Sequence, residues 1–195
     1  LCIPETRDVW LAEFAQGLQQ LAVRYGVQLV GGDTVKGPLN ISIQIMGVVP
    51  DTGWLTRTGA KSGDVVFVSG IPGEAAGGLQ LLQSSTEPNS SASAQPRAQL
   101  LERFYKPVPR VALGIAIRHL ASAAMDVSDG LLTDLRKLCA ASRCGAQLQL
   151  ESLPHSTALH AMFDAAVVEH LALHGGDDYE LLFTVAPENL LQLEA

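Results

Sequence analysis

The chain has 195 residues, a formal net charge of −7 and 47% hydrophobic residues. This apolar share is typical of a folded globular protein, and no apolar run approaches the ~20 residues that a membrane-spanning helix needs. An acidic chain without a cluster of Lys or Arg argues against binding to a nucleic-acid backbone. Three cysteines do not make a disulfide framework, and no signal-peptide pattern opens the chain, so a cytoplasmic protein is expected.

The first fifty residues combine one helical pattern with short extended ones. Apolar residues recur at helical spacing over 9–22, and Asp8 stands where an N-cap is expected. Residues 27–30 form a short apolar run, and in 40–49 isoleucines alternate with other residues, so both segments are predicted as strands. The turn-rich stretch 51–63 predicts a linker between two domains.

Residues 64–195 alternate between strand and helix patterns. The stretch 84–97, with five serines and two prolines, interrupts them and predicts a surface loop. The other expected elements are strands at 64–69, up to 126, at 147–150 and at 180–185, and helices at 75–82, after 109, at 130–142, at 155–171 and from 187. This order predicts a layered α/β or α+β fold, with one domain over 1–50 and a second over 64–195.

Three acidic, glycine-containing turns lie at the ends of predicted strands. They are Gly31-Gly32-Asp33-Thr34, Asp126-Val127-Ser128-Asp129-Gly130 and Gly175-Gly176-Asp177-Asp178-Tyr179-Glu180. Glycine allows a sharp turn and the close approach of a ligand, and carboxylates at strand ends suit Mg²⁺ and the phosphate oxygens it bridges. Each turn alone could be structural, as a turn former or a helix cap. Their repetition favours a metal-assisted phosphate site.

Arg57 is the cation best placed to serve such a site. It lies in a Thr-Arg-Thr-Gly stretch of the predicted linker, where a guanidinium could bridge phosphate oxygens. A solvated linker arginine is the alternative interpretation.

Several other motifs lack a required residue. In Gly59-Ala60-Lys61-Ser62, an alanine separates the glycine from the lysine, which a Walker A phosphate loop does not allow. His170 and His174 have the spacing of a zinc helix, without the glutamate of a metalloprotease. Cys139 and Cys144 lack CxxC spacing, and core packing is the better interpretation for the cysteine on the apolar helix face.

Four motifs occur in one order along the chain and together resemble the bacterial thiamine-monophosphate kinases. They are Gly31-Gly32-Asp33-Thr34-x-x-Gly37-Pro38, Arg57-x-Gly59-Ala60-Lys61-x-Gly63-Asp64, Asp126-Val127-Ser128-Asp129-Gly130-Leu131 and Gly175-Gly176-Asp177-Asp178-Tyr179-Glu180-Leu181-Leu182-Phe183-Thr184. The resemblance covers essentially the whole chain. It places the chain in a superfamily with aminoimidazole ribonucleotide synthetase, selenophosphate synthetase and a hydrogenase maturation protein.

The resemblance implies a fold and an activity. An N-terminal α/β domain would form a homodimer, and ATP would bind between it and a C-terminal α/β domain. The γ-phosphoryl group of ATP would pass, with Mg²⁺, to thiamine monophosphate and give thiamine diphosphate. Such a transfer asks the protein mainly to position groups and neutralise charge.

The resemblance also implies roles for individual residues. The implied Mg²⁺ ligands are Asp33, Asp126 and Asp129, the implied ATP contacts are Gly32, Asp33, Arg57 and Ser128, and the implied substrate contact is Asp177. Asp177 stands where the family usually has Glu, and its side chain is shorter by one methylene. Val35-Lys36 replaces the family's Thr-Arg, which keeps the charge and loses the planar guanidinium.

The ends of the chain suggest a fragment. It begins with Leu1 and not Met, and it ends at Ala195 within a helical pattern. In the family an earlier stretch supplies further metal-binding acids and a later one closes over thiamine, so the 195 residues alone are expected to be inactive. Two alternatives stay open: a related ATP-using enzyme with another acceptor, and a non-catalytic nucleotide-binding module.

Overall fold

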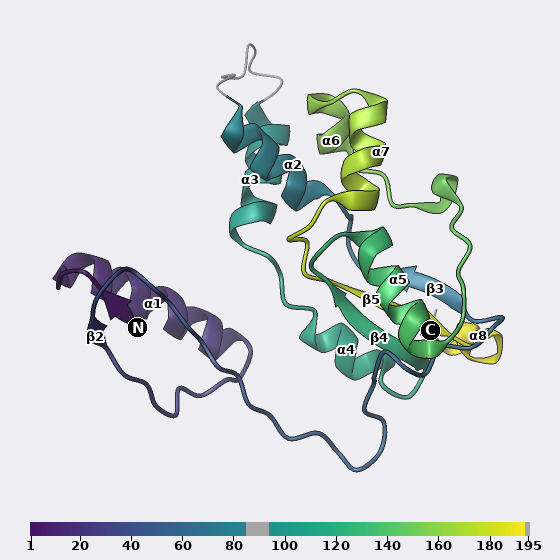
Figure 1. Ribbon diagram of the computed structural model, residues 1–195, viewed down its shortest axis with the longest axis horizontal. Helices are drawn as coiled ribbons and strands as arrows, with labels where there is room; N and C mark the ends of the chain where they lie inside the picture. Colours follow the sequence, from purple (N-terminus) through teal and green to yellow (C-terminus); the bar gives the residue numbers. More distant parts are fainter. Residues whose placement is uncertain (85–93, 194–195) are drawn as a thin grey trace. The chain divides into compact units, whose positions relative to one another are not determined.

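The structure is a computed structural model that describes residues 1–84 and 94–193 (Figure 1). It divides into two compact units, Leu1–Val49 and Pro50–Ala195. Most of the loop predicted at 84–97 lies outside the described residues, and its last four residues begin a helix that the sequence patterns did not indicate. In the two described ranges, no helix combines the length and apolar character needed to cross a bilayer.

Unit 1 contains one long helix and a small parallel ladder. Helix α1 spans Asp8–Arg24, close to the predicted 9–22. Strand β1 (Cys2–Ile3) pairs with β2 (Val35–Lys36), and a further bridge joins Cys2 to Asn40. Trp10 and Phe14 lie one helical turn apart on α1, and their rings stack with centroids 5.4 Å apart.

The strands predicted at 27–30 and 40–49 do not form in unit 1. Their residues carry no strand assignment, and Ile41, Ile43 and Ile45 are exposed. An extended segment needs a neighbouring strand to satisfy its backbone groups and a packed layer to bury its apolar face. Among the described residues of unit 1, the bridge of Asn40 to Cys2 is the single such pairing in these two segments, and most of their apolar side chains stay exposed.

Unit 2 is built on a sheet whose three described strands are all antiparallel to their neighbours. Strands β3 (Val65–Val68), β4 (Ala121–Val127) and β5 (Glu180–Val185) lie in the order β3-β5-β4. In this register Val127 faces Glu180 across the ladder. The end of β4 therefore lies beside the beginning of β5, at one edge of the sheet.

Helices cover both faces of this sheet and extend beyond one end (Figure 1). The remaining helices of the described chain are α2 (Glu74–Gln83), α3 (Ala94–Tyr105), α4 (Val111–Ile117), α5 (Leu131–Ser142), α6 (Thr157–Met162), α7 (Ala165–His174) and α8 (Leu190–Leu193), with 3₁₀ turns at Leu150–Ser152 and Pro187–Asn189. Helix α5 packs on one face of β4 and β5, where Leu131, Leu135 and Leu138 meet Val127 and Leu182.

The other face of the sheet and the helical end have their own apolar clusters. Ile117 of α4 packs with Phe183 and Val185 of β5. Helices α2, α3, α6 and α7 enclose a third cluster around Leu100 and Leu159. Layers of helix against sheet confirm the predicted α/β class.

Two further predictions for unit 2 are wrong. The helix predicted at 155–171 is divided into α6 and α7, because Asp164 caps a new helix by accepting a 3.0 Å hydrogen bond from the Val167 N–H. The strand predicted at 147–150 is irregular and leads into a 3₁₀ turn. Among the described residues, no strand pairs with this segment.

Part of the stretch 51–63 is attached to unit 2. The Thr56 carbonyl accepts a 3.0 Å hydrogen bond from the Ala124 N–H, and the Arg57 carbonyl accepts one of 2.6 Å from the Ser142 hydroxyl. Ala60 is buried in the same cluster as α5. The backbone of Arg57 is thereby held against β4 and α5.

Candidate functional site

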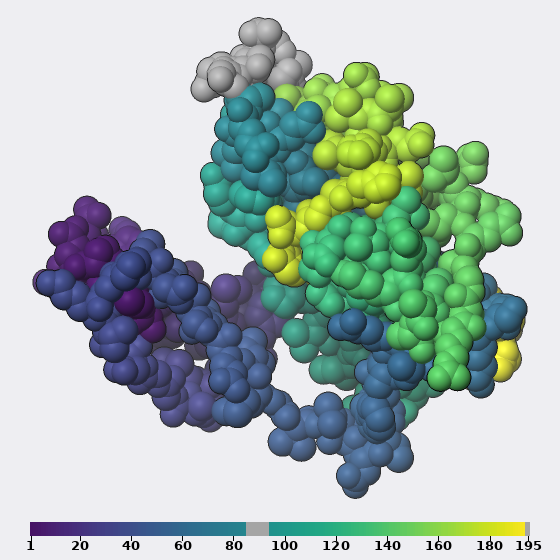
Figure 2. Space-filling model, in the orientation of Figure 1, coloured from purple at the N-terminus to yellow at the C-terminus, as the bar shows by residue number. Residues whose placement is uncertain are grey.

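Two of the three acidic turns meet at the edge of the sheet where β4 ends and β5 begins. The Asp177 N–H donates to the Ser128 carbonyl at 2.9 Å, and the Tyr179 N–H donates to the Val127 carbonyl at 2.8 Å. A Cβ on Gly176 would lie 2.7 Å from the Ser128 oxygen, so this approach needs glycine. In Figure 2 the yellow segment of the second turn lies at the surface beside green α5.

Asp134 fixes the conformation of the first of these turns. This side chain is fully buried, and its Oδ2 accepts hydrogen bonds from the N–H groups of Ser128 and Asp129, both at 2.9 Å. Lys137 donates to Asp134 Oδ1 at 2.7 Å and also to Asp129. These hydrogen bonds from Lys137 to Asp129 and Asp134 raise the pKa of the lysine. Asp134 was not among the residues predicted for the site. The one sequence feature that could have indicated it is a carboxylate in the first turn of a predicted helix that follows an acidic loop.

The predicted carboxylates of unit 2 form one acidic surface. Asp126 and Asp129 are exposed and Asp177 is half-buried. The Tyr179 hydroxyl lies 3.2 Å from Asp177 Oδ1. Burial raises the pKa of Tyr179, and the charges of Asp177, Asp126 and Asp129 raise it further, because a phenolate would add a fourth negative charge.

This surface meets some of the requirements of Mg²⁺. Magnesium is commonly held by one or two carboxylates, with waters and substrate phosphates completing its shell. Asp126 and Asp129 could supply that number of carboxylates. Within the described ranges, no group of three or more His, Cys, Asp or Glu side chains gathers into a metal site. A cation here would therefore need phosphate or water oxygens as well.

The remaining predicted residues lie elsewhere in the chain. Gly32 and Asp33 are exposed in unit 1, where Asp33 Oδ1 accepts a 2.8 Å hydrogen bond from the Thr34 N–H. Arg57 is exposed in unit 2. The roles implied for Gly32, Asp33 and Arg57 stay predictions.

A buried ion network lies directly behind the acidic surface. Glu180, only 1% exposed, accepts hydrogen bonds from Arg110 Nε and Nη2, both at 2.6 Å, and from Arg103 and the Ser69 hydroxyl. Burial alone would raise the pKa of Glu180, but the hydrogen bonds from Arg110, Ser69 and Arg103 together hold it below its usual value. The buried Glu74 lies 3.5 Å from Arg103 Nε on the same network.

Asp178 joins this network to the beginning of α2. Its Oδ2 accepts a 2.7 Å hydrogen bond from the Gly73 N–H, and its Oδ1 accepts one of 3.2 Å from the Ala75 N–H. Burial raises the pKa of Asp178 to about 6, against the opposing effect of these two hydrogen bonds. The sequence motif contains Asp178, but only the structure shows that it is buried and caps a helix.

The raised pKa of Asp178 predicts a measurable pH dependence of stability. The folded-state pKa of about 6 lies above the ordinary aspartate value of 3.8, so the folded chain binds this proton more tightly than the unfolded chain does. Stability relative to an Asp178→Asn variant should therefore rise as the pH falls from 7 to 4, by ~2 kcal/mol. Urea unfolding of both proteins at pH 4, 5, 6 and 7 measures this difference. A difference that does not change with pH would contradict the assignment.

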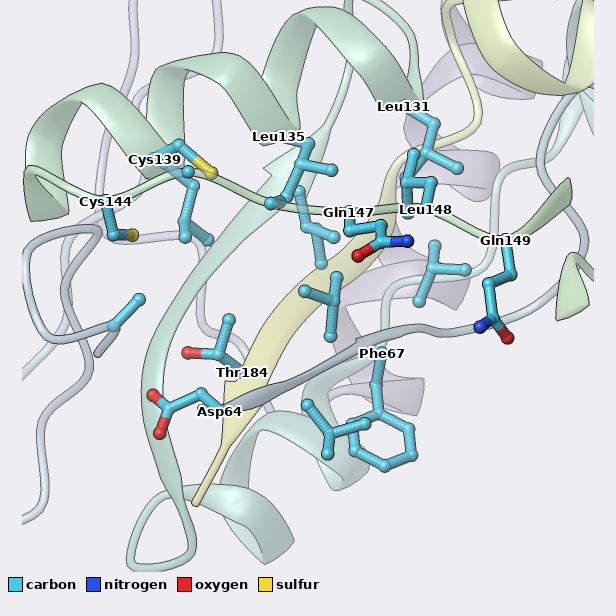
Figure 3. A pocket seen from close by; sticks show the side chains of 18 of the residues that line it. Asp64, Phe67, Leu131, Leu135, Cys139, Cys144, Gln147, Leu148, Gln149 and Thr184 are labelled. Atoms are coloured by element: carbon cyan, nitrogen blue, oxygen red, sulfur yellow. The ribbon is translucent and has the colours of Figure 1, made fainter. Parts of the chain in front are cut away.

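A separate cavity of about 720 Å³ lies between the sheet and the segment 144–154 (Figure 3). Leu131, Leu135 and Leu138 of α5 form one wall, and β3 forms another. None of the residues predicted for ATP, metal or substrate lines it. The acidic surface, and not this cavity, is therefore the candidate functional site.

Comparison with known proteins identifies relatives of the whole chain. It is 42% identical to a thiamine-monophosphate kinase of Salmonella typhimurium over 97% of its length, and spans 57% of that relative. A crystal structure of thiamine-monophosphate kinase from Stenotrophomonas maltophilia matches 100% of this chain and 62% of its own, with 36% identity and a TM-score of 0.88. A structure described as "AaThiL complexed with AMPPCP and TMP" matches 96% of this chain and 60% of its own, at 28% identity and a TM-score of 0.78.

These similarities confirm the resemblance to thiamine-monophosphate kinases that the four motifs indicated. The chain spans less than two thirds of each of these relatives. Residues 1–49 match the model of the AIR synthase related protein, N-terminal domain, and residues 61–194 match that of the C-terminal domain. The chain therefore belongs to the AIR synthase related protein family.

Proposed function

We propose that this chain belongs to an enzyme that transfers the γ-phosphoryl group of ATP to thiamine monophosphate. The observation that carries the proposal is the joining of the turns 126–130 and 175–180 into one acidic surface at a sheet edge. The similarity to thiamine-monophosphate kinases, one of them bound to AMPPCP and TMP, supports ATP and thiamine monophosphate as the reactants. The family resemblance adds a homodimer and a cytoplasmic location.

The residues of the acidic surface have complementary roles in this proposal. Mg²⁺ held by Asp126 and Asp129 would neutralise phosphate charge during transfer. The Ser128 hydroxyl would donate to a phosphate oxygen of ATP, and Asp177 would contact the thiamine substrate. Tyr179, hydrogen-bonded to Asp177, would hold that carboxylate in place. Gly32, Asp33 and Arg57 would complete the contacts to ATP and metal.

The activity is tested directly with the longest natural form of the protein. Incubation with Mg²⁺, ATP and thiamine monophosphate should form thiamine diphosphate and ADP in equal amounts. Turnover of another acceptor without turnover of thiamine monophosphate would instead support a related enzyme. Binding of Mg-ATP without any turnover would support a nucleotide-binding module.

The carboxylates are tested by a double substitution, Asp126→Asn with Asp129→Asn. We expect the affinity for Mg-ATP to fall at least tenfold in calorimetry, since each carboxylate supplies both a ligand and a charge. The control replaces the exposed Glu169 and Glu188 with Gln, which removes the same charge away from the two turns. An equal loss in both double variants, or no loss in either, would remove Asp126 and Asp129 from the site.

A further inference from the structure

The end of helix α5 brings two cysteines together. The helix stops at Ser142, and Arg143 adopts a left-handed conformation with φ of 57°. The chain then turns back, and the Cys144 N–H donates a 3.0 Å hydrogen bond to the carbonyl of Cys139. This hydrogen bond from the sixth residue to the first marks a Schellman motif, in which the side chains of the two joined residues are often in contact.

The two thiols differ in exposure but share one environment. Cys139 is 9% exposed in the cluster beneath α5, and the half-buried Cys144 packs against that cluster. Both side chains line the cavity beside the sheet, at the same end of α5 (Figure 3). Burial, followed by the charge and the side-chain hydrogen bond of Cys144, raises the pKa of Cys139. The two thiols therefore share one largely apolar environment beside the cavity.

The turn at the end of α5 keeps the two cysteines close in space. Cysteine pairs can be bridged when their Cα atoms lie ~4.4–6.8 Å apart with side chains that converge. The 3.0 Å backbone hydrogen bond of the Schellman turn holds the two residues close together, and both side chains line the same cavity (Figure 3). The spacing of four intervening residues is unlike CxxC, so the sequence motif alone does not reveal the pair.

We propose that Cys139 and Cys144 form a redox-active dithiol that a peroxide converts into a disulfide. The more accessible Cys144 sulfur attacks the O–O bond of the peroxide, becomes a sulfenic acid and releases water or the corresponding alcohol. Cys139 then attacks this sulfur, its proton leaves with the hydroxyl as water, and the S–S bond forms. Two thiols lose two electrons and two protons in total, and the peroxide accepts them.

The bond would alter a defined part of the structure. The segment 144–154, which begins with Cys144, forms one wall of the cavity. A disulfide would fix the beginning of this wall to the end of α5 by a covalent bond. The redox state of the surroundings would thereby determine whether this cavity wall is covalently fixed to α5, independently of the acidic surface.

The test uses the full chain in a Cys2→Ser background, which leaves Cys139 and Cys144 as its cysteines. Dilute protein is treated with hydrogen peroxide, and the remaining thiols are alkylated and counted by mass. The count should fall from two to none without dimerisation. Trypsin cleaves after Lys137 and Arg143 and so separates the two cysteines, which should reappear as one disulfide-linked pair of peptides.

Single variants identify the order of the steps. In Cys139→Ala the Cys144 sulfenic acid cannot be resolved, so dimedone should label Cys144 there and not in the parent. In Cys144→Ser the buried Cys139 should stay reduced under the same treatment. Two free thiols in the treated parent, disulfides only between chains, or over-oxidised Cys144 beside reduced Cys139 would each overturn the proposal.

Discussion

Replacing Glu180 with Gln should lower the free energy of unfolding by ~3–5 kcal/mol, although the substitution only exchanges one buried carboxylate oxygen for an amide nitrogen. Glu180 accepts hydrogen bonds from Arg103, Arg110 and Ser69. The amide loses the negative charge and turns an N–H₂ group toward a guanidinium. Two arginines, with 18% and 28% of their side chains exposed, then keep positive charges that are largely desolvated and no longer paired with this carboxylate.

Urea unfolding at neutral pH measures this loss, and Glu102→Gln is the matched control. Glu102 also pairs with a cation, Lys106 at 3.7 Å, but both side chains are largely exposed. Such a surface pair contributes little, so the control should stay within ~0.5 kcal/mol of the parent. A Glu180→Gln variant as stable as the Glu102→Gln control would show that the network does not hold unit 2 together.

The network explains why only part of the site was predictable from the sequence. Local patterns were sufficient for α5 and β5, because the spacing of Leu131, Leu135 and Leu138 and the run over 180–185 each depend on neighbours in the chain. Burial of Glu180 depends instead on Arg103 and Arg110, which lie 77 and 70 residues earlier. No local pattern distinguishes these charged residues from others that are solvated.

The acidic turns illustrate the same limit in another form. Glycine and aspartate near the ends of predicted strands made each turn a candidate. The structure places the turn 175–180 between α7 and β5, and it forms no strand at 27–30 before Gly31. Their meeting depends on the pairing of β4 with β5, with Val127 opposite Glu180. Such a long-range register follows from the packing of the whole unit. Asp134, which orients Ser128 and Asp129, was missed because its role depends on that folded turn.

Unit 1 shows how a correct pattern can give a wrong local prediction. The alternation at Ile41, Ile43 and Ile45 is typical of a strand with one buried face. The structure leaves these side chains exposed and forms only a two-residue ladder nearby. Periodicity reports the environment for which a segment is suited, and a strand appears only where a partner and a covering layer are present.

Gly130→Ala should destabilise unit 2 by ~2–5 kcal/mol and loosen the candidate site at the same time. Gly130 has φ of 104° and ψ of 147° just before α5, a conformation that side chains other than glycine avoid. A Cβ there would lie 2.7 Å from the His174 carbonyl oxygen and 2.8 Å from its carbon. Backbone atoms cannot yield as a flexible side chain does, so the two turns must separate.

Gly145→Ala is the control for Gly130→Ala, because a Cβ at Gly145 would meet nothing within 4 Å. Its stability should stay within ~0.5 kcal/mol of the parent in urea unfolding. Hydrogen exchange supplies a second measurement, since the Asp177 and Tyr179 amides donate to the first turn. In Gly130→Ala these amides should exchange faster relative to those of β3. If stability and exchange in this variant match those of Gly145→Ala, the close contact between the turns does not depend on glycine at position 130. The acidic surface must then be held by Asp134 and the β4–β5 ladder alone.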